Sequence, residues 1–350
     1  MVSPTPRGYR SATEYRFAEE QTDAIIRVAA YHRRDFSLSV IWFPSREHTH
    51  VRRSISTPFE RTSNIGLGSL DRLPLELMHS TLVYLDMQSV FKFRQVNLRS
   101  RQIVDSIRQY QVVVSHGLNL LCALLRTHIA AHVSLFDFYH ALCTRACAIC
   151  NEFAGFISLL TWERCCFKCL RQAPQMEVRP VAALRRQFHL TRAELRKMRS
   201  FKTLPGIYSM AESVHKSRIA IASVHQAASV AERRQHTVAQ GVPHSSARDR
   251  KFNFMGSCAL PYYDRLTGNV ERGISCAGCQ LALEKDIIGT RAEDWAFEAR
   301  DKVYGKREFL EHFRWCEQAQ LLWKSSGEGS RLPTELPEGA RRGGYFKKRE

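Results

Sequence analysis

The chain has 350 residues, 44% of them hydrophobic, and a formal net charge of +18. This length accommodates one large domain or two small ones, and the hydrophobic content is that of a globular protein. The positive charge attracts anionic partners but says little about fold. Eleven cysteines are too sparse for a small secreted disulfide scaffold.

The sequence also argues against membrane insertion and secretion. The most apolar stretch, residues 119–136, is interrupted by Arg126 and His128, and no run reaches the roughly 20 apolar residues that a membrane span needs. The first 20 residues lack the apolar core of a secretion signal. We therefore expect a cytoplasmic or nuclear protein without membrane contact, in which paired cysteines more often hold metal than bond to each other.

Residues 1–67 mix Pro, Ser, Thr and Arg and show few periodic apolar positions. The patch Val40-Ile41-Trp42-Phe43 is the exception. This composition predicts an arm that is mostly disordered.

Three short amphipathic helices are predicted between residues 68 and 112. Pro74 suits the first turn of a helix, and Asp86 and Asn97 are suited to cap the second and third helices. A unit of this size has too little core to be stable alone, so we expect it to complete its packing on a partner. An ordinary helical hairpin inside a larger domain would show the same periodicity. Leucines recur at helical spacing through the first helix, namely Leu73, Leu77, Leu82 and Leu85.

The segment 73–105 resembles an F-box and aligns with the pattern of that family without a gap. Two positions depart from the pattern, because Thr81 replaces an aliphatic residue and Ser100 replaces a frequent Trp. The matching positions are Leu73-Pro74, Glu76-Leu77, Leu82, Tyr84-Leu85-Asp86, Val96, Arg99, Arg101 and Val104-Asp105.

F-box proteins are substrate receptors of cullin–RING ubiquitin ligases of the SCF type. The resemblance implies that this segment binds a Skp-type adaptor and that the rest of the chain selects a protein target. By the same resemblance, the residues that face the adaptor are Leu73, Pro74, Leu77, Leu85 and Val96.

Buried helices are predicted between residues 118 and 146, followed by the first cysteine group. Its pattern is C-x2-C, fifteen residues, then C-x2-C, the spacing of a four-thiolate zinc site. Two residues between cysteines let one tight turn aim both sulfur atoms at a single ion, and four thiolates leave no open position for catalysis. The expected ligands are Cys147, Cys150, Cys166 and Cys169. Buried free thiols are the alternative, and Cys143 and Cys165 lie close enough to complicate the assignment.

A second group combines Cys276-Ala-Gly-Cys279 with His312 and Cys316, which lie four residues apart and share one face of a helix. Gly278 is expected to let the backbone turn tightly. This set predicts a structural zinc site with three cysteines and one histidine. The gap between the pairs is long, Cys258 could replace His312, and a polar histidine beside buried cysteines is the alternative.

We therefore expect a mainly α protein with two structural zinc ions. Its parts are a disordered arm (1–67), the F-box (68–112), a helical region with the first cysteine group (113–210), a second helical region with the other group (211–325) and a disordered basic tail (326–350). Local patterns add a capping box at Thr191 and a turn at Pro205-Gly206. The whole arrangement resembles a group of fungal F-box proteins that share the cysteine elements, including Arg164-Cys165-Cys166, and a PG-Y motif, here Pro205 to Tyr208.

The leading functional hypothesis is a non-catalytic adaptor subunit that docks on the Skp-type protein and presents a zinc-braced surface to a target. The alternative is a basic zinc protein that contacts nucleic acid, because residues 171–205 carry nine Lys or Arg against two Glu. Against the alternative, neither cysteine group has the spacing of a C2H2 finger. Enzymatic activity is not expected, because the two groups lie too far apart for a RING cross-brace and the HExxH and GxSxG patterns are absent.

Overall fold

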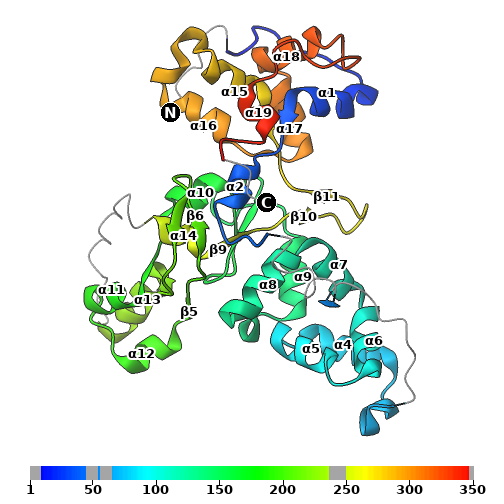
Figure 1. Cartoon of the computed structure of the whole chain (residues 1–350), viewed down its shortest axis with the longest axis vertical. Coiled ribbons are helices and arrows are strands. Elements are labelled where there is room, and N and C mark those ends of the chain that lie inside the picture. Colours follow the sequence, from blue (N-terminus) through cyan, green and yellow to red (C-terminus); the bar gives the residue numbers. More distant parts are fainter. Residues whose placement is uncertain (1–8, 45–53, 56–64, 236–249, 347–350) are drawn as a thin grey trace.

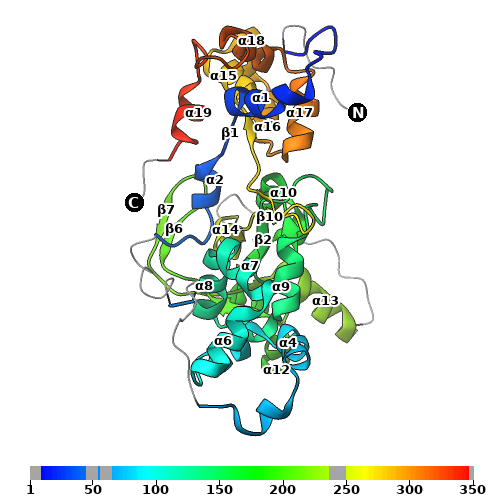
Figure 2. The same ribbon diagram turned by 90° about the vertical axis from the view of Figure 1, so that its right-hand side faces the viewer.

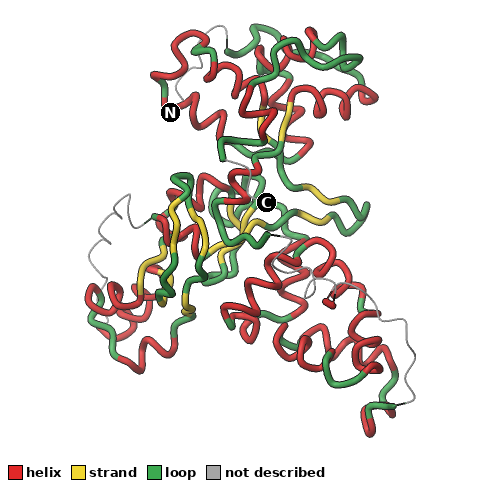
Figure 3. Tube along the Cα trace, in the orientation of Figure 1, coloured by secondary structure: helices red, strands yellow, loops and turns green. Residues whose placement is uncertain are grey.

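The computed structural model of the chain describes residues 9–44, 54–55, 65–235 and 250–346. The fold is mainly helical, as the sequence predicts, and forms three lobes (Figure 1 and Figure 3). We call them the helical lobe (65–142), the central lobe (146–260) and the terminal lobe (9–31 and 274–346). Among the described residues, no helix is long and apolar enough to cross a membrane.

The helical lobe contains the three predicted short helices and extends beyond them. The carboxylate of Asp86 accepts a hydrogen bond from the Ser89 amide (2.9 Å), and Asn97 accepts one from the Ser100 amide (2.8 Å), so both predicted caps are confirmed. Its elements are η2 (Gly68–Arg72), α4 (Leu75–Tyr84), α5 (Met87–Arg94), α6 (Leu98–Ser106), α7 (Arg108–His116), α8 (Leu118–Thr127), η3 (Ile129–His132) and α9 (Leu135–Leu142).

The central lobe contains two small antiparallel sheets, of strand order β3-β2-β9 and β4-β8-β5, and the hairpin β6–β7. Its strands are β2 (Phe156–Ser158), β3 (Arg164–Cys165), β4 (Val178–Pro180), β5 (Ser200–Lys202), β6 (Gly206–Tyr208), β7 (Ser213–His215), β8 (Ala220–Ser223) and β9 (Ser257–Ala259). Its helices are α10 (Phe167–Gln172), η4 (Pro174–Met176), α11 (Val181–Gln187), α12 (Arg192–Lys197), α13 (Val224–Gln235) and α14 (Lys251–Met255). The capping box at Thr191 is confirmed.

The Ala-rich segment after residue 211 is not uniformly helical. Strand β8 pairs with β4 on one side and β5 on the other, and Ile221 at its centre is fully buried. These pairings with strands at other places in the sequence override the helical preference of alanine, which is a weak determinant by itself.

The terminal lobe is built from both ends of the described chain. From the N-terminal side come η1 (Glu19–Gln21), α1 (Thr22–Ala29) and β1 (Ala30–Tyr31), and α2 (Arg34–Leu38) leads toward the central lobe (Figure 2). The other elements are β12 (Ser275–Cys276), α15 (Ala277–Glu284), η5 (Ile287–Ala292), α16 (Asp294–Asp301), α17 (Lys306–Phe313), α18 (Glu317–Ser325) and α19 (Glu338–Arg342). The hairpin of β10 (Tyr262–Tyr263) and β11 (Val270–Glu271) precedes this lobe in the chain.

Segments for which the sequence predicts disorder are folded here. Ile25 and Val28 of α1 are buried in one core with Phe309 and Trp323, and β1 pairs with β12. On the tail side, the amides of residues 34 and 35 donate to the carbonyl oxygen of Gly343. These partners lie hundreds of residues away, so a local composition window does not reveal them. Of the predicted disordered segments, residues 1–8, 45–53, 56–64 and 347–350 lie outside the described residues.

The helical and central lobes share one continuous hydrophobic core. It includes Leu121 and Phe138 from the helical lobe and Phe156 and Leu160 from the central lobe. The apolar patch after residue 39 joins the two, because Ile41 donates to the carbonyl of Ser257 (3.0 Å) and accepts from the side-chain amide of Asn119 (2.9 Å). The helical lobe is therefore anchored to the central lobe through this shared core.

Gly278 is required by helix packing. A Cβ atom at this position would lie 2.3 Å from the backbone nitrogen of Ala319, so α15 and α18 can approach only because the side chain is absent. The close contact, and not a turn around the metal, is therefore what selects glycine here.

We expect Gly278→Ala to lower the free energy of unfolding by about 2 kcal/mol, the usual cost of overpacking, measured by guanidinium denaturation. Gly155→Ala is the matched control, because no atom lies within 4 Å of a Cβ built there. Equal stability of the two variants would contradict the packing argument.

Candidate functional site

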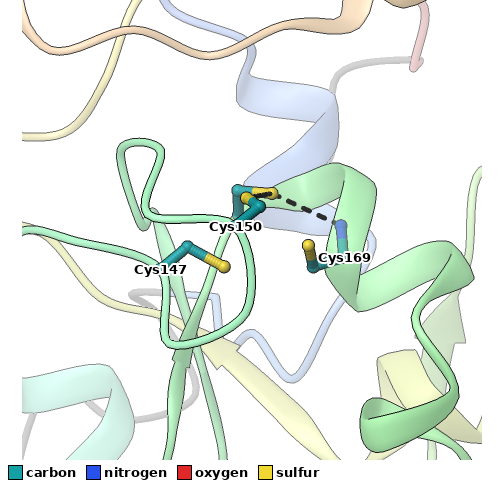
Figure 4. Close-up of side chains that lie close together, drawn as sticks. Cys147, Cys150 and Cys169 are labelled. Atoms are coloured by element: carbon teal, nitrogen blue, oxygen red, sulfur yellow. Dashed lines mark hydrogen bonds between the residues drawn. The ribbon is translucent and has the colours of Figure 1, made fainter.

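The first cysteine group joins a tight loop to the start of a helix. Cys147 and Cys150 lie in the loop that follows α9, and Asn151 closes it with a left-handed φ of 62° and a 3.0 Å hydrogen bond to the carbonyl of Cys147. Cys166 caps α10, and its sulfur accepts a hydrogen bond from the amide of Cys169 (3.3 Å). Figure 4 shows the side chains of Cys147, Cys150 and Cys169 gathered at one place between the loop and α10.

The geometry of this group suits a tetrahedral metal. All four sulfur atoms lie within 4.8 Å of one another, and those of Cys150 and Cys166 are 3.6 Å apart. Metal–sulfur bonds of about 2.3 Å in a tetrahedron place the sulfur atoms about 3.8 Å apart. None of the four cysteines forms a disulfide. The group could therefore hold a metal ion.

Electrostatics distinguish the neighbouring thiols. A hydrogen bond from Cys166 lowers the pKa of the Cys147 thiol to about 4, and the same bond raises the pKa of Cys166. Cys165 is fully buried in strand β3, and burial raises its pKa well above the ordinary value. Strand β3 ends at Cys165, and Cys166 follows in extended backbone as the N-cap of α10. Neighbouring side chains of an extended segment point to opposite sides, so Cys165 enters the core while Cys166 meets the other three cysteines.

The second group repeats the same construction. Cys276 caps α15 and accepts from the amide of Cys279 (3.4 Å), as Cys166 does in α10. The sulfur of Cys316 lies 3.7 Å from that of Cys276, and the sulfur of Cys279 lies 3.4 Å from Nε2 of His312. All four ligand atoms lie within 4.8 Å, so this group could hold a metal as well.

The second group differs from the sequence interpretation in two details. Helix α17 ends at Phe313, so Cys316 lies beyond it, held by a hydrogen bond from its amide to the carbonyl of His312 (3.0 Å). Cys258 is not near these ligands. It is fully buried in β9, where burial raises the pKa of its thiol.

A cavity of about 430 Å³ lies between the two groups. It is lined by ligands from both of them, together with aromatic side chains such as Phe167, Trp295, Tyr304 and Trp315. Ion pairs at its rim join the central and terminal lobes, namely Lys168–Glu298 (3.0 Å), Lys302–Glu152 (2.7 Å) and Arg171–Asp301 (3.6 Å). This cavity could not be predicted from the sequence, because its lining comes from five separate segments of the chain.

The helical lobe exposes a row of apolar side chains. Of the residues expected to face an adaptor, Leu73, Pro74, Leu77 and Val96 are exposed, with Val96 at 67%, whereas Leu85 is half-buried against the core. Tyr84 is 70% exposed and was not among the expected contacts. It lies seven residues after Leu77, so the two share one helix face.

The family model of the F-box domain matches residues 70–111, which comprise α4, α5 and α6. This region defines an SCF-type substrate receptor in general terms, a class whose members are typically non-catalytic subunits of ubiquitin ligases. The chain therefore contains an F-box domain. Comparisons with curated proteins and with solved structures gave no match.

Proposed function

We propose that this protein docks on a Skp-type adaptor through its F-box and recruits a protein target through its central and terminal lobes. The exposed apolar side chains just before and at the start of α4, namely Leu73, Leu75 and Leu77, carry the proposal. Large apolar side chains that face solvent in a contiguous patch commonly mark a protein interface, and Leu73 and Leu77 are 45% and 55% exposed. Soluble ligase subunits of this kind act in the cytoplasm or nucleus.

We further propose that the two cysteine groups bind zinc. Thiolate and imidazole ligands in a closed four-ligand set suit zinc in a structural role. Cys147, Cys150, Cys166 and Cys169 would hold one ion, and Cys276, Cys279, His312 and Cys316 the other. Each ion would then tie two segments of the chain together, so the free energy of zinc binding would stabilise the fold.

Target recruitment is assigned to the surface around the cavity. Small-molecule sites commonly form where two lobes meet, and this cavity of about 430 Å³ has their typical size, so it would take a side chain of the target and not a whole protein surface. Its walls carry Cys166 on one side and His312 on the other, so both proposed zinc ions support its shape. It belongs to the two lobes that do not carry the F-box, which leaves the adaptor surface free.

Adaptor docking is tested with Leu73→Ser/Leu77→Ser. We expect this variant to lose co-purification with a Skp-type adaptor, because two apolar contacts are replaced by hydroxyls. Leu321→Ser is the control, since Leu321 is 47% exposed on α18 of another lobe. Retained adaptor binding by the double variant would refute the assignment of this surface.

Zinc binding is tested by metal analysis of purified variants. We expect Cys169→Ser and Cys316→Ser each to contain about one zinc fewer per chain and to melt at lower temperature, since a three-ligand set binds less tightly. Cys165→Ser is the control, because Cys165 faces the core beside the ligand Cys166. If Cys165→Ser alone lost metal, the ligand set would be wrong.

The nucleic-acid alternative has one structural observation in its favour. Basic residues on α11 and α12 are exposed, namely Arg185, Arg186, Arg192, Arg196 and Lys197. Phosphate binding by such a surface weakens steeply with salt. If the proposed function holds, we expect the affinity of the purified protein for duplex DNA to be at least about tenfold lower than its affinity for the adaptor at physiological salt. Fluorescence anisotropy measures the DNA affinity. Tight, strongly salt-dependent DNA binding without adaptor binding would favour the alternative.

A further inference from the structure

Helix α9 lies outside the matched F-box but continues its exposed apolar face. The side chain of Phe136 is 43% exposed, and its ring stacks on Tyr84 of α4 with centroids 5.5 Å apart and planes 27° apart. On the other side, Phe136 stacks on the exposed ring of His140 at 6.3 Å. Tyr84, Phe136 and His140, which we call the aromatic row, therefore cross from one helix to the other.

The position of α9 is fixed by the F-box itself. The amide of Leu135 donates to the carbonyl of Leu85 (3.0 Å), and the amide of Met87 donates to the carbonyl of Val133 (2.8 Å). These two bonds attach the start of α9 to the junction of α4 and α5. The buried face of α9, with Phe138 and Leu142, packs into the main core. Phe136 is therefore held in place on the outer face.

The aromatic row lies on the same face of α4 as Leu77, with the exposed Thr81 between them, whose hydroxyl donates to the carbonyl of Leu77 (2.8 Å). Leu77 and Tyr84 are two turns apart on the same face of α4, about 10 Å along the helix axis, and Phe136 contacts Tyr84 directly. Two large rings that remain exposed although they stack on each other suit a protein partner, because aromatic side chains are enriched at the centres of interfaces.

We propose that Phe136 and the outer face of α9 contact the Skp-type adaptor, so that the docking surface extends beyond the F-box domain. This inference rests on the proposed function, because the adaptor is the partner of the adjoining surface. It assigns an adaptor-binding role to residues 136 and 140, which lie outside the matched segment. We name the Skp-type adaptor as the partner because the aromatic row shares one face of α4 with Leu77.

The test measures the affinity of the purified full chain for a purified Skp-type adaptor by isothermal titration calorimetry. We expect Phe136→Ala to raise the Kd about tenfold, the effect of truncating a central interface aromatic, and His140→Ala to raise it less. Phe297→Ala is the matched control. Phe297 is 38% exposed on α16 and also lies against a neighbouring side chain, Arg300. Its variant should bind as the parent does.

The outcomes separate this inference from the proposed function. Loss of affinity in Leu73→Ser/Leu77→Ser with parent-like affinity in Phe136→Ala would overturn the extension and leave the F-box assignment intact. No binding by the parent would overturn both. An equal loss in the Phe136 and Phe297 variants would show a non-specific effect and overturn the extension. Melting temperature and zinc content identify an unfolded variant, and Phe136→Leu, which preserves apolar packing but removes the ring, then replaces Phe136→Ala in the same comparison.

Discussion

The convergence of two sets of four ligand atoms is the constraint on which the central and terminal lobes depend. Sulfur atoms less than 4 Å apart without a disulfide are a costly arrangement unless protons or a cation lie between them. The elements around them are short, and the strands of the small sheets have two to four residues. Elements of this length are marginal by themselves. A metal ion bound by the second group would close the forty-residue separation between Cys276 and Cys316 and would supply the stabilisation that longer sheets give other proteins.

In both groups a cysteine caps the start of a helix. In α10 and α15 the first cysteine of the pair accepts a hydrogen bond from the amide of the second. Each group therefore holds one cysteine pair at the start of a rigid helix, while the other two residues come from a different segment and determine which parts of the chain the group brings together.

The sequence predicts those features that depend only on residues close together in the chain. The helix caps at Asp86, Asn97 and Thr191 could be predicted because each side chain accepts a hydrogen bond from the amide three positions later. The cysteine pairs within each group could be predicted because two intervening residues limit where the two sulfur atoms can point. What a sequence window misses is long-range: the burial of α1 in a core with α18, the cavity between the two cysteine groups, and the strands that pair with β8. The choice of Cys166 over Cys165 depends on the extended backbone where β3 meets α10, which a sequence window does not show.

The pairing of the N-terminal segment with the far end of the chain has a consequence for biosynthesis. Arg10 pairs with Cys316, and Ala30 pairs with Cys276. A ribosome that adds about 5–20 residues per second needs about 15–60 s to travel from one to the other. During that interval Ile25 and Val28 have no native partner and are available to chaperones. The terminal lobe is therefore the last to form, and translation that stops before residue 316 releases a chain that carries the F-box but not the complete second cysteine group.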